Sequence, residues 1–321
     1  MKAYVQNGYG TADVYELVEV PRPVPSQDEV LVKVVASAVN DWECGVLRPA
    51  WIMRPLIGAR RPRGKFRIMG CDMAGRVESA GQNVSSFASG DEVYGDLSGY
   101  GFGGFAEYVC VNPENLERKP AGVSFEQAAA IPHAAELALQ AMRSADPLRA
   151  GQEVLVNGAG GGVGTLLIQL LKRLDVEVTG VDRASKLGRL RELGYDHVVA
   201  WPEEDFTRLG RRYDLIVDVK TSAPAYAYLR ALKPAGVYAT VGGDKIFSFM
   251  SLAPVVSLFT RRRLKAVMLK PNRNLSEISA LLGSGALAPI VDEVFAFCDL
   301  RQALTRFQNA QHVGKIVIRM P

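Results

Sequence analysis

The chain has 321 residues, a hydrophobic content of 48%, a charged content of 22% and a formal net charge of +4. These values are typical of a globular protein with room for two domains, and they exclude a collagen-like or disordered chain. So mild a positive charge does not by itself indicate nucleic-acid binding. The longest apolar run, 246–260, contains Pro254 and is too short to cross a bilayer comfortably. We expect it to line a pocket or a subunit contact, or to form a core helix.

The cysteines and the N-terminus indicate a reducing, cytoplasmic setting. No apolar signal region follows Met1, and no C-x-x-C spacing suggests a disulfide framework or a zinc knuckle. The cysteines are scattered, at Cys44, Cys71, Cys110 and Cys298. We expect no membrane and no nucleic-acid partner.

Residues 1–120 are rich in β-forming residues broken by Pro, Gly and Asn. Short strands at such close spacing favour a partly open β-barrel over a parallel sheet. The predicted strands are Tyr15–Val20, Glu29–Ala36, Gly75–Ala80, Glu92–Gly95 and Phe105–Val111.

The pattern changes near residue 124. Ser124 and Gln127 have the spacing of a helix capping box, and Pro132 separates that helix from a second one at Ala134–Arg143. Strand and helix patterns then alternate, with Tyr213–Asp218 expected as a strand and Ala223–Leu232 as a helix, which predicts an α/β fold with a doubly wound parallel sheet.

The tail returns to β-like segments around one more helix, Leu300–Gln308. We therefore expect a β domain that is interrupted by a nucleotide domain and closed by the tail. The predicted divisions are a catalytic domain over residues 1–123, a dinucleotide-binding domain over 124–270 and a returning C-terminal segment over 271–321.

A glycine-dense turn follows the strand-like run Val154–Asn157 and precedes the amphipathic segment Leu166–Leu174. This order brings backbone N–H groups and a helix N-terminus to a pyrophosphate. The strict G-x-G-x-x-G spacing is not met, because the pattern is A-x-G-x-x-G. The alternative is a tight turn without a ligand. The predicted cofactor contacts are Ala159, Gly160, Gly161, Gly162, Val163 and Gly164.

Two interpretations compete where the next strand-like run ends. Asp182 would reach the ribose hydroxyls of NAD. Arg183 beside it, helped by Ser185 and Lys186, would instead hold the 2′-phosphate of NADP.

Several segments of the chain, which occur in the order found in that family, resemble the medium-chain dehydrogenase/reductase superfamily. More narrowly, they resemble its zinc-free, quinone-oxidoreductase-like branch. The resemblance covers nearly the whole chain and implies a GroES-like barrel beside a Rossmann domain. It rests on Met69–Gly81, Phe87–Gly95, Gly104–Val109, the glycine turn, Leu193–His197 and Gly314–Val317.

Zinc-dependent members of that superfamily bind the metal through cysteine, histidine and a further cysteine or carboxylate. Here the first ligand position matches Asn40 or Asp41, and the expected His-Glu pair near Gly64–Gly70 is missing. The histidines lie far apart in sequence, so we expect no zinc ligand set. Hydride transfer would then depend on positioning and on hydrogen bonds to the developing oxyanion.

The catalytic candidates carry both a functional and a structural interpretation. The resemblance implies that Asn40, with Asp41 beside it, orients the substrate carbonyl or the nicotinamide; otherwise Asn40 is a loop residue that satisfies its own backbone. His133 would add polarity near the nicotinamide, and Tyr94 would donate into the pocket. A structural histidine and a packed phenol are the alternatives, with water as the proton source.

Further cofactor contacts are expected where strands end at the sheet's switch point. Among the residues at these strand ends are Asp218, which precedes Val219, and Gly243, which follows Gly242. The resemblance also brings the segment after the sixth strand toward the nicotinamide. The predicted residues are Val219, Val241, Gly242, Lys270 and Asn272.

Three functions are compatible with these residues. The leading one is an NAD(P)H-dependent reductase of a quinone, an activated alkene or a carbonyl. The second is an enoyl reductase for thioester-linked substrates, and the third is a cofactor-binding structural or regulatory protein without turnover. Asp182 favours NADH, whereas the resemblance tips the preference slightly to NADPH. We expect a small-molecule substrate and a homodimer.

Overall fold

The computed structural model describes residues 1–243, 249, 253–254, 257–258 and 260–321. They form two compact units, one of Met1–Glu136 with Lys270–Pro321 and the other of Leu137–Leu269. The apolar run 246–260 lies mostly outside the described residues. Among the described residues, no helix combines the length and apolar character that crossing a membrane requires.

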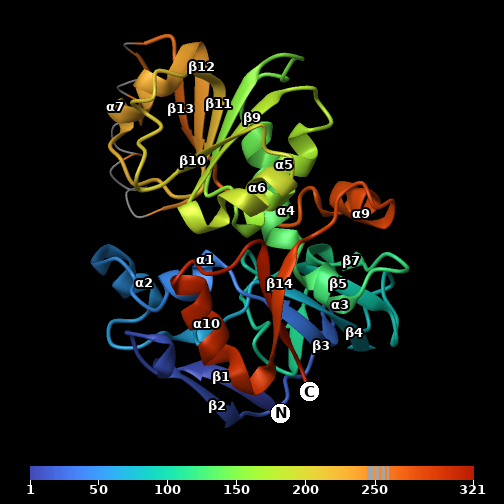
Figure 1. Ribbon diagram of the computed structural model, residues 1–321. Helices are drawn as coiled ribbons and strands as arrows, with labels where there is room; N and C mark the ends of the chain where they lie inside the picture. The colour runs from blue at the N-terminus through green and yellow to red at the C-terminus, as the bar shows by residue number, and fades with distance from the viewer. Residues whose placement is uncertain (244–248, 250–252, 255–256, 259) are drawn as a thin grey trace. The chain divides into compact units, whose positions relative to one another are not determined.

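The first unit is a β domain with a few short helices (Figure 1). Its strands and α-helices are β1 (Lys2–Gln6), β2 (Tyr15–Glu19), β3 (Val30–Ala38), α1 (Asp41–Gly45), α2 (Arg54–Ile57), β4 (Asp72–Ala80), β5 (Glu92–Asp96), β6 (Tyr108–Val111), β7 (Glu117–Arg118), α3 (Phe125–Ala129), α9 (Leu275–Gly283), β14 (Val291–Ala296), α10 (Leu300–Gln308) and β15 (Lys315–Arg319). Short 3-10 helices lie at Ala12–Val14, Trp51–Met53, Gly64–Phe66, Pro113–Asn115 and Phe297–Asp299.

The main sheet of this unit joins the two ends of the sequence. Its strand order is β14-β15-β3-β4-β5-β7, with β6 also paired to β3. Strand β15 runs antiparallel to β3, and β14 runs parallel to β15. The tail thus returns to the first unit in the structure, and this unit is the GroES-like barrel that the resemblance implied.

Strand β3 shows why this sheet forms where it does. Val30, Val32 and Val34 alternate toward the core and are almost fully buried, as expected of β-branched residues in a strand. On β4, a Cβ added to Gly75 would lie 2.2 Å from the carbonyl oxygen of Lys33. Only glycine allows the two strands to approach this closely.

The second unit contains the nucleotide-binding pattern. Helix α4 (Pro132–Met142) crosses the boundary between the units. The remaining elements are β8 (Glu153–Asn157), α5 (Gly162–Leu171), β9 (Glu177–Asp182), α6 (Leu187–Glu192), β10 (His197–Ala200), β11 (Tyr213–Asp218), α7 (Ala225–Tyr228), β12 (Leu232–Thr240) and β13 (Arg263–Ala266), with 3-10 turns at Ala184–Lys186 and Leu229–Ala231.

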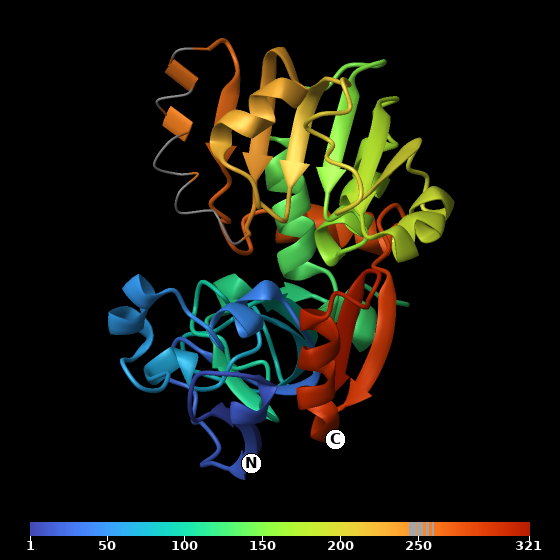
Figure 2. The ribbon, with the colours of Figure 1, turned by 60° about the vertical axis from the view of Figure 1, so that its left-hand side comes forward.

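The six strands of this unit are parallel, in the order β10-β9-β8-β11-β12-β13. This is the doubly wound Rossmann order, and it confirms the predicted fold class. Figure 2 shows the strands running in one direction. Val154, Leu155 and Val156 of the central strand β8 are fully buried, because helices cover both faces of such a sheet.

The structure moves several predicted boundaries. The first unit extends to Glu136 instead of ending at residue 123, because α3 packs on β3 and β4. The two predicted helices are separate, but the break lies at Ala130 and Ile131, and Pro132 begins α4, where its missing N–H costs no hydrogen bond. The helix expected over Ala223–Leu232 is only α7 and a 3-10 turn, because Leu232 already pairs with Tyr213 as the start of β12.

Candidate functional site

The glycine turn connects β8 to α5 as predicted, with Gly161 at the N-cap and Gly162 and Val163 beginning the helix. A Cβ on Gly164 would lie 2.4 Å from the Ala159 carbonyl oxygen, so only glycine lets the helix pack on the turn. A Cβ on Gly161 would meet nothing closer than the Gly158 carbonyl oxygen, at 3.4 Å. The free space at Gly161 and the N–H groups of the first helical turn fit the pyrophosphate of a dinucleotide.

Asp182 ends β9 and reaches back to this turn. Its Oδ2 accepts a hydrogen bond from the Gly160 N–H at 2.8 Å, and its Oδ1 accepts one from the Arg183 N–H at 2.8 Å. Lys186 Nζ lies 3.6 Å from Asp182 Oδ1. Burial lowers the pKa of Lys186, and Asp182 acts in the opposite direction. Lys186 is thus a buried partner of Asp182, whereas Arg183 is exposed.

The other predicted residues of the second unit lie where β11 and β12 end. A Cβ on Gly158 would be 3.1 Å from the Cβ of Val219, so Val219 lies beside the glycine turn. The Val241 N–H donates to the Asp218 carbonyl oxygen at 3.0 Å, and the Gly242 carbonyl oxygen accepts from the Thr221 N–H at 3.2 Å. The predicted strand-end residues therefore share one edge of the sheet with the turn.

Tyr195, which the sequence did not indicate as a site residue, contacts the glycine turn. Its hydroxyl donates to the carbonyl oxygen of Gly164 at 2.9 Å, and its ring lies where a Cβ of Gly180 would be. The side chain is almost fully buried. Tyr195 belongs to the segment Leu193–His197, which was used only as part of the resemblance.

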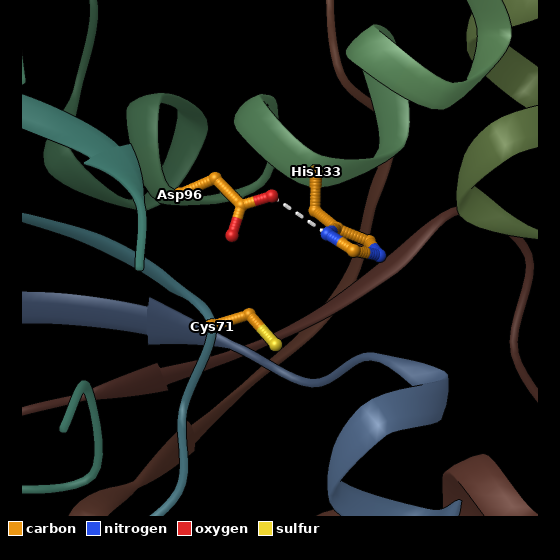
Figure 3. A group of neighbouring side chains, drawn as sticks. All are labelled: Cys71, Asp96 and His133. Carbon is orange, nitrogen blue, oxygen red and sulfur yellow. Dashed lines mark hydrogen bonds and ion pairs between the residues drawn. The ribbon is translucent and has the colours of Figure 1, made fainter. Parts of the chain in front are cut away.

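In the first unit, His133 and Asp96 form a buried pair (Figure 3). His133 is the second residue of α4, Asp96 is the last residue of β5, and His133 Nδ1 lies 2.7 Å from Asp96 Oδ2. The Asp96 side chain is fully buried, the His133 side chain is 9% exposed, and the second ring nitrogen points away from Asp96.

The two members of this pair shift each other's pKa. Burial lowers the pKa of His133, but the Asp96 and Asp72 carboxylates raise it more, so the net pKa lies above its usual value. Burial raises the pKa of Asp96, but His133 and the Ser98 N–H lower it more, so the net pKa lies below its usual value. The pair therefore favours a protonated imidazole beside an ionised carboxylate.

Asp72, at the start of β4, joins His133 to Asn40 and Lys315. Its Oδ1 accepts from the His133 N–H at 2.8 Å. Its Oδ2 accepts from Asn40 Nδ2 and from Lys315 Nζ, both at 3.0 Å. Lys315 Nζ also donates to Asn40 Oδ1 at 2.5 Å. Both ends of the Asn40 amide are thus engaged by buried charged groups, which fits a positioning role better than direct contact with substrate.

The two remaining catalytic candidates of the first unit, Asp41 and Tyr94, have different surroundings. Asp41 is the exposed first residue of α1. Tyr94 is fully buried, and burial raises the pKa of its hydroxyl to about 12. A phenol so reluctant to ionise matches the alternative of a packed core residue.

Asn272 and Glu136 hold Asp96 from the other side. The Asn272 side chain accepts from the Asp96 N–H at 2.9 Å and donates to the Asp96 carbonyl oxygen at 2.7 Å. The Glu136 carboxylate accepts from the N–H groups of Asn272 and Asn274 at 2.6 and 2.9 Å. The predicted pair Lys270 and Asn272 thus belongs to the first unit, where Asn272 fixes the backbone at Asp96.

The prediction that residues so far apart in sequence cannot converge as metal ligands is wrong. Cys71, Asp96 and His133, although far apart in sequence, place one possible ligand atom each within 4.8 Å of one another (Figure 3). Separation along the chain does not prevent convergence, since Cys71 directly precedes β4, Asp96 ends β5 and His133 lies at the start of α4.

The detailed geometry nevertheless does not fit a zinc ion. Zinc binds nitrogen and oxygen at about 2.1 Å, so two ligands of one tetrahedral zinc lie about 3.4 Å apart. His133 Nδ1 and Asp96 Oδ2 are closer than that, as hydrogen-bonded partners are. Burial, with the carboxylates of Glu43, Asp96 and Asp72, raises the pKa of the Cys71 thiol well above its usual value. No step is therefore derived through a metal.

Comparisons with known proteins match most of the chain. Residues 26–121 match the family model described as alcohol dehydrogenase GroES-like domain, and residues 193–318 match the one described as zinc-binding dehydrogenase. The chain is 29% identical over 337 residues to the 2-methylene-furan-3-one reductase of Solanum lycopersicum, covering 99% of this chain and 79% of the relative. It is 28% identical over 337 residues to the chloroplastic NADPH-dependent alkenal/one oxidoreductase of Arabidopsis thaliana, with the same coverage.

A solved structure supports the same assignment. The quinone oxidoreductase of Coxiella burnetii superimposes with a TM-score of 0.90 at 25% identity, covering 100% of this chain and 99% of that one. The two family models together span both units, and the relatives are named as reductases or oxidoreductases. The chain is an oxidoreductase and belongs to the medium-chain dehydrogenase/reductase superfamily, in its zinc-free, quinone-oxidoreductase-like branch.

Proposed function

We propose that this protein is a metal-independent, NAD(P)H-dependent reductase of activated alkenes and quinones, in which His133 supplies the proton. The observation that carries the proposal is the buried His133–Asp96 pair. The names of the relatives, which include an alkenal/one oxidoreductase and a quinone-oxidoreductase homologue, support the substrate class.

When bound, a reduced nicotinamide supplies a hydride. Reduction of an activated alkene or a quinone also consumes one proton, so the site needs an acid. The Asp96 carboxylate raises the pKa of His133 and so favours its protonated form, which can act as the general acid. Asp96 keeps the charged imidazole stable, and Asp72 fixes the backbone of His133 through its N–H.

The cofactor is held by the glycine turn of the second unit. The first turn of α5 and the space at Gly161 receive the pyrophosphate, and Asp182 faces the same turn. Of the residues predicted to hold a 2′-phosphate, Lys186 is engaged by Asp182, which leaves Arg183 and Ser185 on the exposed side. NADPH, named for a relative, remains our slight preference.

The direct test is a panel of enones, quinones and simple ketones, assayed for oxidation of NADPH and of NADH. We expect turnover of the enones and quinones, with saturated carbonyl and hydroquinone products. The proposal fails if both cofactors bind but neither is oxidised with any member of the panel.

An enoyl reductase acting on thioesters is the second candidate, because it requires the same hydride and proton. Crotonyl coenzyme A in the panel separates the two. A specificity constant for it well above that of the matched free enone would assign the thioester class.

A further inference from the structure

Positive charge is concentrated in one segment of the first unit that the proposed reaction does not use. Residues 48–67 contain no acidic residue, and the cations there are Arg48, Arg54, Arg60, Arg61, Arg63, Lys65 and Arg67. Outside this segment, acidic residues outnumber basic ones. Among the described residues, no carboxylate forms an ion pair with any of these seven cations. Their charge is available to an anion from solution.

Part of this segment forms a cleft. A cavity of about 330 Å³ is lined by Arg61, Arg63 and Arg67, together with Gln6 and Asn7 at the end of β1. This volume is near the lower limit for a small-molecule site. Three guanidinium groups along one cleft can bind phosphoryl oxygens through paired N–H donors.

The cleft is held in shape by backbone bonds. The Gln6 N–H donates to the Arg67 carbonyl oxygen and the Arg63 N–H to the Ile57 carbonyl oxygen, both at 2.9 Å. Gly58 has a φ of +137°, and a Cβ there would lie 2.1 Å from the Arg61 carbonyl oxygen. A loop fixed in this way loses little conformational entropy when a ligand binds.

Gln6, which lines the cleft, has a buried acceptor without a partner among the described residues. Gln6 is 1% exposed, and its Nε2 donates to the carbonyl oxygens of Gly8 and Val46 at 2.9 and 3.1 Å. These two bonds fix the amide orientation and leave Gln6 Oε1 buried without a hydrogen bond among the described residues. An unpaired buried acceptor is unfavourable, so a ligand that offers a hydroxyl or an N–H would relieve this cost.

We propose that this cleft binds a small organic phosphate. The arginines contact the phosphoryl group, whose double negative charge suits three cations better than a single carboxylate does. Gln6 Oε1 accepts a hydrogen bond from the organic part. A free phosphorylated metabolite and the phosphopantetheine arm of a thioester substrate share this chemistry, because both combine a phosphate with hydroxyl or amide donors.

Calorimetric titration of the full-length protein with inorganic phosphate, glycerol 3-phosphate and 4′-phosphopantetheine, at constant ionic strength, tests the site. We expect at least one organic phosphate to bind more tightly than inorganic phosphate, and the two organic probes to distinguish the metabolite from the thioester arm. The double variant Arg61→Gln/Arg63→Gln should weaken binding by about tenfold or more. The control is Arg208→Gln, which removes an exposed arginine of the second unit.

A further variant tests the role of the glutamine. Gln6→Met should reduce affinity for the organic phosphate while leaving that for inorganic phosphate unchanged, with circular dichroism confirming the fold. The proposal is overturned if none of the probes binds at millimolar concentration, if the arginine variant binds as well as the parent, or if only anionic lipid vesicles bind. Because no turnover is measured, these outcomes are independent of the proposed reductase activity.

Discussion

At the scale of single residues, the His133–Asp96 pair makes the sharpest prediction. His133→Gln replaces the imidazole with a polar side chain that cannot act as an acid. The kcat should therefore fall by about a hundredfold, the lower range for a general acid. The dissociation constant of the cofactor should not change, because the glycine turn is intact. His197→Gln, at a half-exposed histidine paired with Glu177, is the matched control. An unchanged kcat in His133→Gln would assign the proton to water.

The same pair predicts a pH dependence with a definite sign. The protonated fraction of His133 falls as pH rises through its raised pKa, so kcat should decrease on the alkaline side. In Asp96→Asn the charge that raises this pKa is gone, and the decrease should begin at lower pH. Identical pH profiles for the parent and Asp96→Asn would show that His133 does not limit the reaction.

Cofactor choice is also decided by single residues. Arg183→Ala should raise the KM for NADPH more than that for NADH, because only NADPH carries a 2′-phosphate for the exposed guanidinium. Steady-state kinetics with both cofactors measure the difference. Equal effects on the two would mean that Arg183 faces only solvent and that Asp182, held at the glycine turn, sets the preference.

At the scale of elements, two glycines of one turn should respond differently to substitution. Gly161→Val should abolish cofactor binding in a fluorescence titration but leave thermal stability nearly unchanged, because its Cβ meets no atom closer than 3.4 Å. Gly164→Ala places a Cβ 2.4 Å from a backbone oxygen and should destabilise the unit by about 1–3 kcal/mol. The opposite ranking in stability would contradict this reading of the turn.

The elements themselves were largely predictable from sequence. The bounds predicted for the strand Tyr213–Asp218 and the helix Leu300–Gln308 are those of β11 and α10, and the Ser124 capping box is present, since these signals are local. The α7 region was mispredicted because pairing with β11, a tertiary contact, extends β12 backwards to Leu232.

The candidate site was predictable only in part, for the same physical reason. The glycine turn lies within one continuous stretch, so its pattern is visible along the chain. His133 was identified, but its partners were not, because Asp96 and Asp72 reach it through separate strands and no spacing marks them. Lys315 was missed as a site residue although its segment contributed to the resemblance.

At the scale of the whole molecule, activity should not require a metal. His133 Nδ1 and Asp96 Oδ2 lie at hydrogen-bond distance, closer together than two ligands of one tetrahedral zinc ion. Prolonged treatment with a strong chelator should therefore leave turnover unaltered. The prediction fails if elemental analysis finds stoichiometric zinc in the protein and the chelator removes this zinc together with the activity. The homodimer stays a prediction, to be checked by light scattering.

The pairing of β15 with β3 has a consequence for how the protein is made. The second unit is continuous in sequence, so a ribosome will have released all of it before the last strand of the first unit emerges. The end of β3 at Ala36–Ala38 must wait through most of translation for β15, since β6 pairs only with Val30–Lys33, and an uncovered edge invites pairing with other chains. We expect nascent chains that stop before β15 to contain a folded nucleotide unit and a protease-sensitive first unit. The first unit should therefore need chaperone protection until β15 has been synthesised.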